Sequence, residues 1–449
     1  MHKYVWAGIY ILVFSLSLEA QAFLPNASLT GQTPDVYRVV EKHNFRKREN
    51  GKYLGAAYRE VRGTLTRESG EWYAGRFYIL EETKRAAQLV AGKVDDSLPS
   101  RLQLGPLGAV RAGSPGRFPT MRDFPALPQE NVSSGASWQA VGERILDPEF
   151  SGAITPVRVH VEYVYKGAGE YKGFPGHYLT AKYAVRYRRG QASASPELEE
   201  VNGTHDMNIF LPSEAGGPRM ISETFREQYR YRGGRELSLE GTVLTVFEGV
   251  APLNRPETAA RIAEIINKEE PSLTTRIAEA PPAVPSVPSP PPAAAPEAPA
   301  VSGKPELPPP VAAGPQKKPS FAELPLPDIE VQGRDEGVAL TINNLSFRPD
   351  SAQLLPSEAP RLEALAKALL TLPDRSFLVV GHSASTGRPA GEKELSIDRA
   401  RAVAEALQKR GVPADKMVYE GRGSSEPVAP NDTESGRARN RRVEIIILD

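Results

Sequence analysis

Hydrophobic and polar residues alternate with a period of two in the middle of the chain. Valine or tyrosine occupies every second position in residues 157–165, and apolar residues do the same in 179–187. A glycine-rich stretch, 166–176, separates the two runs. Such alternation is typical of strands with one buried and one solvent-facing side, so the runs predict an antiparallel hairpin. Further strands are expected at 36–45, 53–65, 72–81, 206–211, 224–232 and 242–248.

A helical period follows these strands. Ile262, Ile265 and Ile266 form an apolar stripe within residues 256–270, which predicts a helix that closes the N-terminal region. From residue 338 onward the pattern predicts two helices, the second ended by Gly411, among four strands. The expected strands are 338–342, 377–380, 416–420 and 442–448. The order βαβαββ predicts a two-layer α/β sandwich.

Proline is concentrated in one segment. Residues 281–319 hold 15 prolines in 39 positions and no aromatic residue, a composition that favours an extended linker over a packed core. A linker of this kind predicts a multi-domain protein. We expect a β-rich domain of antiparallel strands at 23–115, a second β-rich domain with the closing helix at 116–280, a proline-rich linker at 281–325 and the α/β sandwich at 326–449.

Composition excludes several classes of function. Lys plus Arg equals Asp plus Glu at 55 each, so the chain lacks the positive field of a nucleic-acid-binding protein. The sequence has no cysteine, which excludes disulfides, thiolate metal sites, cysteine nucleophiles and lipidation on a cysteine. We expect no catalytic residues, no metal site and no cofactor.

The pattern of the N-terminal residues predicts an export signal. Residues 4–18 are an apolar run shorter than the ~20 residues that a membrane-spanning helix needs. Ala20-Gln21-Ala22 follows as a small-x-small cleavage pattern, so residues 1–22 are interpreted as a signal peptide. An uncleaved N-terminal anchor is the alternative. The expected location is the periplasm, with association with the outer membrane as a further expectation.

Five motifs in the last quarter of the chain occur in a recognisable order. They are Phe347-Arg-Pro-Asp-Ser351, Gly381-His-Ser-Ala-Ser-Thr-Gly387, Leu395-Ser-Ile-Asp-Arg-Ala400, Gly421-Arg-Gly423 and Asn440-Arg-Arg-Val-Glu444. Together they resemble the OmpA/Pal/MotB C-terminal domain, which binds peptidoglycan non-covalently. The resemblance covers about residues 330–449. The overall layout also resembles multi-domain OmpA-like proteins of spirochaetes.

The resemblance implies a ligand site. In that family an Asp after Gly-His-Thr holds the ammonium of the stem-peptide diamino acid, and the Arg of Leu-Ser-x-x-Arg-Ala holds a carboxylate. Arg399 matches the Arg, but Ala384 stands at the Asp position. Glu392 stands at a family Asn position and could supply a carboxylate from another direction. The candidate ligand-binding residues are Arg399, Ser383, Glu392, Asn440 and Arg441.

Three functions remain open. The first is a non-enzymatic envelope protein that tethers an exported β-rich module to peptidoglycan, with binding that is weak or non-standard because of Ala384. An envelope protein is then the expected partner of the N-terminal region, and nucleic acid is not a partner. The second is an OmpA-type outer-membrane β-barrel protein. The third is a wall-active enzyme with an anchoring domain.

Overall fold

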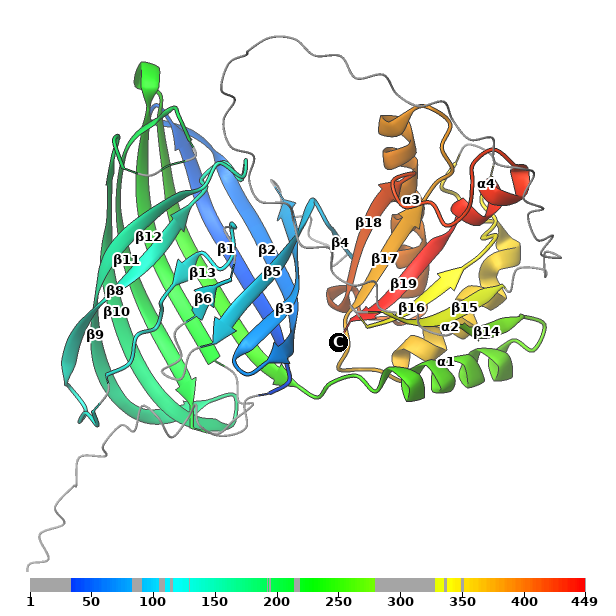
Figure 1. The fold of residues 1–449 in the computed structure, drawn as a ribbon, viewed down its shortest axis with the longest axis horizontal. Coiled ribbons are helices and arrows are strands. Elements are labelled where there is room, and N and C mark those ends of the chain that lie inside the picture. The colour runs from blue at the N-terminus through cyan, green and yellow to red at the C-terminus, as the bar shows by residue number, and fades with distance from the viewer. Residues whose placement is uncertain are drawn as a thin grey trace, which may run out of the picture.

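The computed structural model describes residues 34–448, apart from 83–90, 105–109, 114–115, 129, 192, 194, 214–218, 279–327, 335–336 and 349–350. The expected signal peptide and the proline-rich linker lie outside the described residues. Figure 1 shows two bodies of structure side by side, a large curved sheet and a smaller sheet covered by helices. Within the described part of the chain, no helix is long and apolar enough to cross a membrane.

The larger body is a 12-stranded sheet with the order β6-β5-β3-β2-β1-β13-β12-β11-β10-β9-β8-β7. It curls into a nearly closed barrel, because its two edges approach each other where Val110 forms a bridge with Phe124. We call it the barrel-like sheet. Its strands are β1 (Val36–Glu49), β2 (Lys52–Ser69), β3 (Trp72–Glu82), β5 (Asp96–Leu104), β6 (Val110–Ala112), β7 (Met121–Arg122), β8 (Ser137–Leu146), β9 (Thr155–Tyr171), β10 (Phe174–Arg188), β11 (Leu198–Pro212), β12 (Arg219–Tyr231) and β13 (Glu236–Val250).

The alternating pattern sets which side chains face inward. On β10, Leu179, Ala181 and Tyr183 are buried in the interior, whereas Lys182 and Arg186, which occupy alternate positions, are exposed. The predicted hairpin is confirmed, since β9 and β10 pair antiparallel around a tight turn. The antiparallel, β-rich character of the N-terminal region is therefore confirmed.

The division of this region into two β-rich domains at residue 115 differs from the structure. Strands from both sides of that boundary belong to one sheet, because β1 pairs with β2 on one side and with β13 on the other. Val36 lies opposite Val250 in that pairing. A pairing between strands about 200 residues apart leaves no trace in local periodicity.

The smaller body is a seven-stranded mixed sheet with the order β14-β15-β16-β19-β17-β18-β4. Its strands are β4 (Gly92–Lys93), β14 (Thr275–Ala278), β15 (Ile329–Arg334), β16 (Gly337–Ile342), β17 (Phe377–His382), β18 (Met417–Gly423) and β19 (Val443–Leu448). The helices are α1 (Arg255–Glu269), α2 (Ala359–Leu370), α3 (Pro389–Gln408) and α4 (Glu434–Asn440), with 3-10 turns at Arg232–Gly234, Pro356–Glu358 and Ala414–Lys416. The predicted βαβαββ order runs from β16 to β19, with the short helix α4 as an addition between β18 and β19.

Helix α1 belongs to this second body rather than to the barrel-like sheet. Ile262 and Ile266 of α1 are fully buried in the same apolar core as Leu365 of α2 and Ile445 of β19. The expectation that this helix closes a second β-rich domain is wrong, because its apolar stripe covers the α/β sheet instead. Strand β14, which follows α1, pairs with β15 and extends the same sheet.

The two bodies pack against each other. Tyr78 and Leu80 point outward from β3 and share an apolar cluster with Leu378, Val418 and Ile446 on the face of the α/β sheet that the helices leave open. Arg62 of β2 donates a hydrogen bond of 2.7 Å to the carbonyl of Asp415. The barrel-like sheet therefore covers one face of the α/β sheet while the helices cover the other.

Candidate functional site

The motif residues gather where β17 ends and the chain turns into α3. The backbone N–H of Ser383 donates to the carbonyl of Gly423, and that of Ser385 donates to Asn431 Oδ1 at 3.1 Å. These bonds tie the 383–388 loop to the segments that follow β18. The loop carries Ala384 and leads directly into the helix that carries Arg399.

Arg399 lies against an aromatic ring. Its guanidinium carbon is 5.0 Å from the ring centroid of Phe347, within the range of a cation–π contact. The contact joins the first family motif to the third, although about fifty residues separate them in sequence. Asp398, the neighbouring carboxylate on α3, pairs with Arg401 at 2.7 Å instead. Phe347 was not among the candidate residues; the aromatic residue that opens the first motif was the signal for it.

Glu392 holds the loop together. Its carboxylate accepts hydrogen bonds from the Ser424 hydroxyl, from the backbone N–H groups of Thr386 and Arg388, and from the Thr386 hydroxyl. These bonds, led by the one from Ser424 and followed by the backbone N–H of Thr386, lower the pKa of Glu392 to about 2. Oε1 accepts three of these bonds and Oε2 accepts one, so the carboxylate serves to hold the loop to the residue that follows β18.

Ala384 and Ser383 belong to the 383–388 loop. Ala384 is 5% exposed and places a methyl group where the family motif has a carboxylate. Ser383 is 7% exposed, and its hydroxyl has no hydrogen-bond partner among the described residues. A buried hydroxyl without a partner is costly in a folded protein, which makes it a ready contact for a polar ligand group.

The side chains of Asn440 and Arg441 make contacts within the C-terminal domain. Asn440 is 1% exposed, and its amide makes two hydrogen bonds with Ala429 and one each with Val428 and Asn431. Asn440 thereby fixes residues 428–431. Within this segment, Asn431 accepts the hydrogen bond from the backbone N–H of Ser385. Arg441 pairs with Glu434 at 2.6 Å on the surface of α4. The structure therefore groups Arg399 with Phe347, gives Asn440 and Glu392 supporting contacts, and places Arg441 in a surface ion pair.

His382 is a buried residue of the same motif that sequence reasoning did not single out. It is 1% exposed, and its Nε2 lies 3.7 Å from Glu444. Burial, reinforced by the nearby guanidinium of Arg442, lowers the pKa of His382 to about 3. The imidazole is therefore neutral throughout the physiological range. The described residues contain no group of three or more side chains arranged to hold a metal ion.

Comparison with known proteins places this site in context. The OmpA family model matches residues 346–441. Peptidoglycan-binding protein ArfA of Mycobacterium tuberculosis is 38% identical over 109 residues, which cover 24% of this chain and 33% of ArfA. YiaD of Escherichia coli is 40% identical over 105 residues, covering 23% of this chain and 48% of YiaD. The outer-membrane lipoprotein YfiB of Pseudomonas aeruginosa is 35% identical over 142 residues, covering 30% of this chain and 84% of YfiB.

The similarity covers different shares of the three relatives. This chain spans about a third of ArfA and about half of YiaD, but most of YfiB. All matched segments fall on about a quarter to a third of this chain. By their names the relatives are binding and envelope proteins rather than enzymes.

Proposed function

This chain belongs to the OmpA family through its C-terminal domain, and from that premise we propose that it is a non-enzymatic cell-envelope protein that contacts peptidoglycan. The observation that carries the proposal is the placement of Arg399 over Phe347, which brings together two of the family motifs. The proposed site would combine this cation and aromatic ring with the buried hydroxyl of Ser383. The proposed location is the periplasm, in keeping with relatives that are envelope proteins.

The pocket favours a carboxylate over an ammonium. Arg399 supplies positive charge and Ser383 a hydrogen-bond donor, both of which suit a carboxylate of the stem peptide. Ala384 supplies no anion, and the carboxylate of Glu392 already accepts four hydrogen bonds. We therefore propose contact through a stem-peptide carboxylate, with weak binding of free diaminopimelate.

The outward surface of the barrel-like sheet supports this proposal over an outer-membrane β-barrel protein. A membrane barrel carries an apolar outward band with aromatic residues at both edges. Here Lys182, Arg186 and Asp206 point outward from β10 and β11 and are exposed, while Tyr183 and Tyr187 of β10 point inward and are buried. We propose that the barrel-like sheet is a module carried on the peptidoglycan-contacting domain, with an envelope protein as its partner.

A sacculus pull-down tests the proposal. Purified full-length protein should sediment with insoluble sacculi, and Arg399→Ala should remove most of that binding. Arg441→Ala is the matched control, because it deletes another arginine of the same domain, one that forms a surface ion pair with Glu434. Equal sedimentation of all three proteins would place binding elsewhere, and release of soluble muropeptides by the wild type would favour the wall-active enzyme.

A further inference from the structure

The hairpin turn between β1 and β2 carries two exposed apolar side chains at one end of the barrel-like sheet. Tyr53 and Leu54 are each 50% exposed, and among the exposed large apolar side chains of the described residues they are the only two adjacent in sequence. Single apolar residues on a surface are common, but a neighbouring pair beside a hairpin turn forms a small apolar patch. The turn is tight, since Asn50 and Gly51 both have positive φ, of 48° and 77°. We call residues 46–54 the β1–β2 tip.

A β-bulge accounts for the exposure of this pair. Lys47 lies opposite Gly55 and Arg48 lies opposite Tyr53, so Leu54 is an extra residue without a counterpart on β1. A bulge interrupts the alternation of a strand and re-aims side chains, and bulges are frequent at the rims of barrels. The exposure of Leu54 therefore follows from the register of the hairpin.

The β1–β2 tip is also basic. Its nine residues include four basic residues and one acid, Glu49. That acid is already engaged, because Arg235 lies between Glu49 and Glu149 at 2.5 Å from each. Arg48 and Lys52 are exposed, and neither forms an ion pair with any residue in the described part of the chain. Two cations thus flank the apolar pair without a carboxylate partner among those residues.

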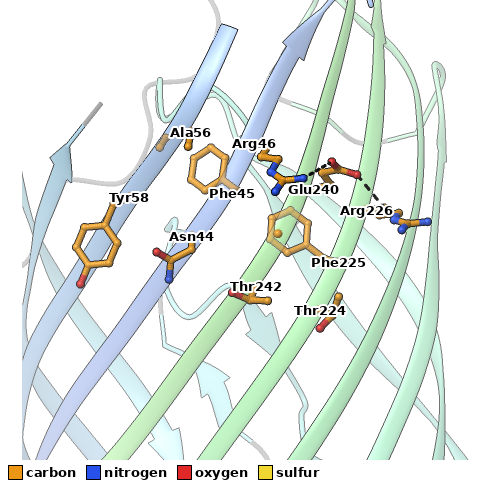
Figure 2. A pocket seen from close by; sticks show the side chains of 12 residues that line it. Asn44, Phe45, Arg46, Ala56, Tyr58, Thr224, Phe225, Arg226, Glu240 and Thr242 are labelled. Carbon is orange, nitrogen blue, oxygen red and sulfur yellow. Dashed lines mark ion pairs between the residues drawn. The ribbon is translucent and has the colours of Figure 1, made fainter. Parts of the chain in front are cut away.

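Neighbouring acids do not neutralise this end of the sheet. Glu240 is shared by Arg46 and Arg226 at the long distances of 3.8 Å and 3.9 Å, and Figure 2 shows it between the two guanidinium groups. The β12–β13 turn, whose backbone bonds to that of the β1–β2 turn, adds one exposed acid, Glu236, and one exposed base, Arg232. Positive charge therefore predominates around the tip.

The tip is placed to reach a flat surface. Among the described residues, β2 pairs with β3 only from Tyr58 onward, so residues 52–57 have β1 as their single neighbouring strand. The α/β domain contacts β2 further along, where Arg62 donates its hydrogen bond to the carbonyl of Asp415. Figure 1 shows β1 and β2 rising along the barrel-like sheet toward its upper end, where they join.

An exposed apolar pair flanked by cations matches a membrane surface that contains anionic lipids. Tyrosine suits the headgroup region because its ring is apolar and its hydroxyl is polar. Arginine and lysine lay their stems along an apolar surface while their charged ends reach phosphate groups. We propose that the β1–β2 tip binds the surface of a membrane containing anionic phospholipids, with Tyr53 and Leu54 among the headgroups and Arg48 and Lys52 at the phosphates. This peripheral contact lies outside the OmpA-like domain and goes beyond the proposed function.

Both parts of the tip are needed for such a contact. The attraction between basic residues and an anionic surface is screened by salt within about 10 Å at ordinary ionic strength. A small apolar patch alone buries little area, so stable association at a membrane surface takes two signals together. Loss of either the charges or the apolar pair should therefore weaken binding.

The test measures co-sedimentation of purified full-length protein with lipid vesicles. Vesicles of equal parts phosphatidylglycerol and phosphatidylcholine are compared with vesicles of phosphatidylcholine alone. The wild type should bind the anionic vesicles and should be released as salt is added. Two double variants, Arg48→Gln with Lys52→Gln and Tyr53→Ser with Leu54→Ser, should each bind about tenfold or more weakly.

The β9–β10 turn provides a matched control, because it lies at the opposite end of the sheet and carries similar side chains. Lys172 lies over the Tyr171 ring at 5.6 Å from its centroid, and Phe174 is 39% exposed. Residues 166–174, however, include only two basic residues and one acid. The double variant Lys172→Gln with Phe174→Ser should bind anionic vesicles as the wild type does.

The outcomes separate this contact from the proposed peptidoglycan site. Binding to anionic vesicles that is lost in both tip variants, and kept in the control and in Arg399→Ala, supports the tip. No binding by the wild type, equal binding to neutral vesicles, or tip variants that bind as the wild type does would overturn it and leave the proposed function standing. Retention on immobilised polyglutamate without binding to vesicles would also overturn it and would indicate an acidic protein partner. Unfolding midpoints equal to the wild type's show that the variants are folded.

Discussion

Thr275 and Ile329 lie opposite each other in neighbouring parallel strands, although residues 279–327 separate their strands in sequence. Thr274 and Asp328 strengthen the junction through hydrogen bonds of 2.8–2.9 Å between them. The proline-rich segment therefore leaves the α/β domain and returns to the same edge of the same sheet. It does not connect the barrel-like sheet to the α/β domain; residues 251–254 do so.

Cleavage of the proline-rich segment should leave the molecule in one piece. A trypsin-type protease has a site after Lys317, since Lys304 and Lys318 precede prolines. We expect two bands on a denaturing gel but a single, unshifted peak on native size-exclusion chromatography, because α1 and β14 remain embedded in the C-terminal core. In urea the two fragments should separate. Two peaks under native conditions would show that α1 is not held by that core.

Helix α1 should be required for the stability of the C-terminal domain. Ile262 is fully buried among residues of this domain, so Ile262→Ala should lower the free energy of unfolding by about 2–5 kcal/mol. Glu264→Ala, an exposed position on the same helix, should change it by less than about 0.5 kcal/mol. Denaturant unfolding of both variants measures the difference. An effect of Ile262→Ala as small as that of Glu264→Ala would contradict the docking of α1.

Local patterns in the sequence account for part of this structure. The alternation in 157–165 and 179–187 predicted the hairpin because period two fixes which side of a strand faces the core. It could not predict that β1 pairs with β13, since register between distant strands depends on closure of the whole sheet. The stripe of Ile262 and Ile266 likewise predicted a helix with a buried face but not the surface that buries it.

The candidate site, like the fold, could be predicted only in part from the sequence. The motifs predicted a ligand site at Arg399 and the 383–388 loop and marked Ala384 as a missing carboxylate, and that site stays a prediction. The contacts of Glu392 could not be predicted, because its donors Thr386 and Ser424 converge only after the loop and the end of β18 are in place. Sequence spacing does not distinguish a carboxylate that binds a ligand from one that, like Glu392, accepts hydrogen bonds from its own loop.

Stability should fall as the pH drops below about 6.5, and His382 should account for part of the loss. Burial and Arg442 keep His382 neutral in the folded protein down to a pKa of about 3, whereas the unfolded chain takes up the proton near 6.5. The unfolded state therefore binds more protons between these values, and acid favours unfolding. From pH 7.5 to pH 5 this residue should cost about 2 kcal/mol of unfolding free energy.

The measurement is denaturant unfolding at both pH values. His382→Gln removes the titrating group, so its loss of stability between pH 7.5 and pH 5 should be smaller than that of the wild type by about that amount. His160→Gln, an exposed position on the outer face of β9, is the control and should follow the wild type. A His382→Gln protein with the wild-type pH dependence would show that other groups carry the whole effect.

Restoring the missing carboxylate should restore recognition of a diamino acid. Ala384→Asp places an anion at the position where the family motif carries one, while Glu392 stays engaged by its four hydrogen bonds. The ammonium of diaminopimelate then gains a charged partner, worth about 1.5–3 kcal/mol or roughly ten- to a hundredfold in affinity. Ala384→Asn has the same shape without the charge and should gain little. Calorimetry with free diaminopimelate compares the two, and adding Arg399→Ala to Ala384→Asp should remove the gain because the carboxylate loses its cation. Tight binding by the wild type itself would show that another acid already serves the ammonium, and equal gains from Asp and Asn would show that shape rather than charge limits this pocket.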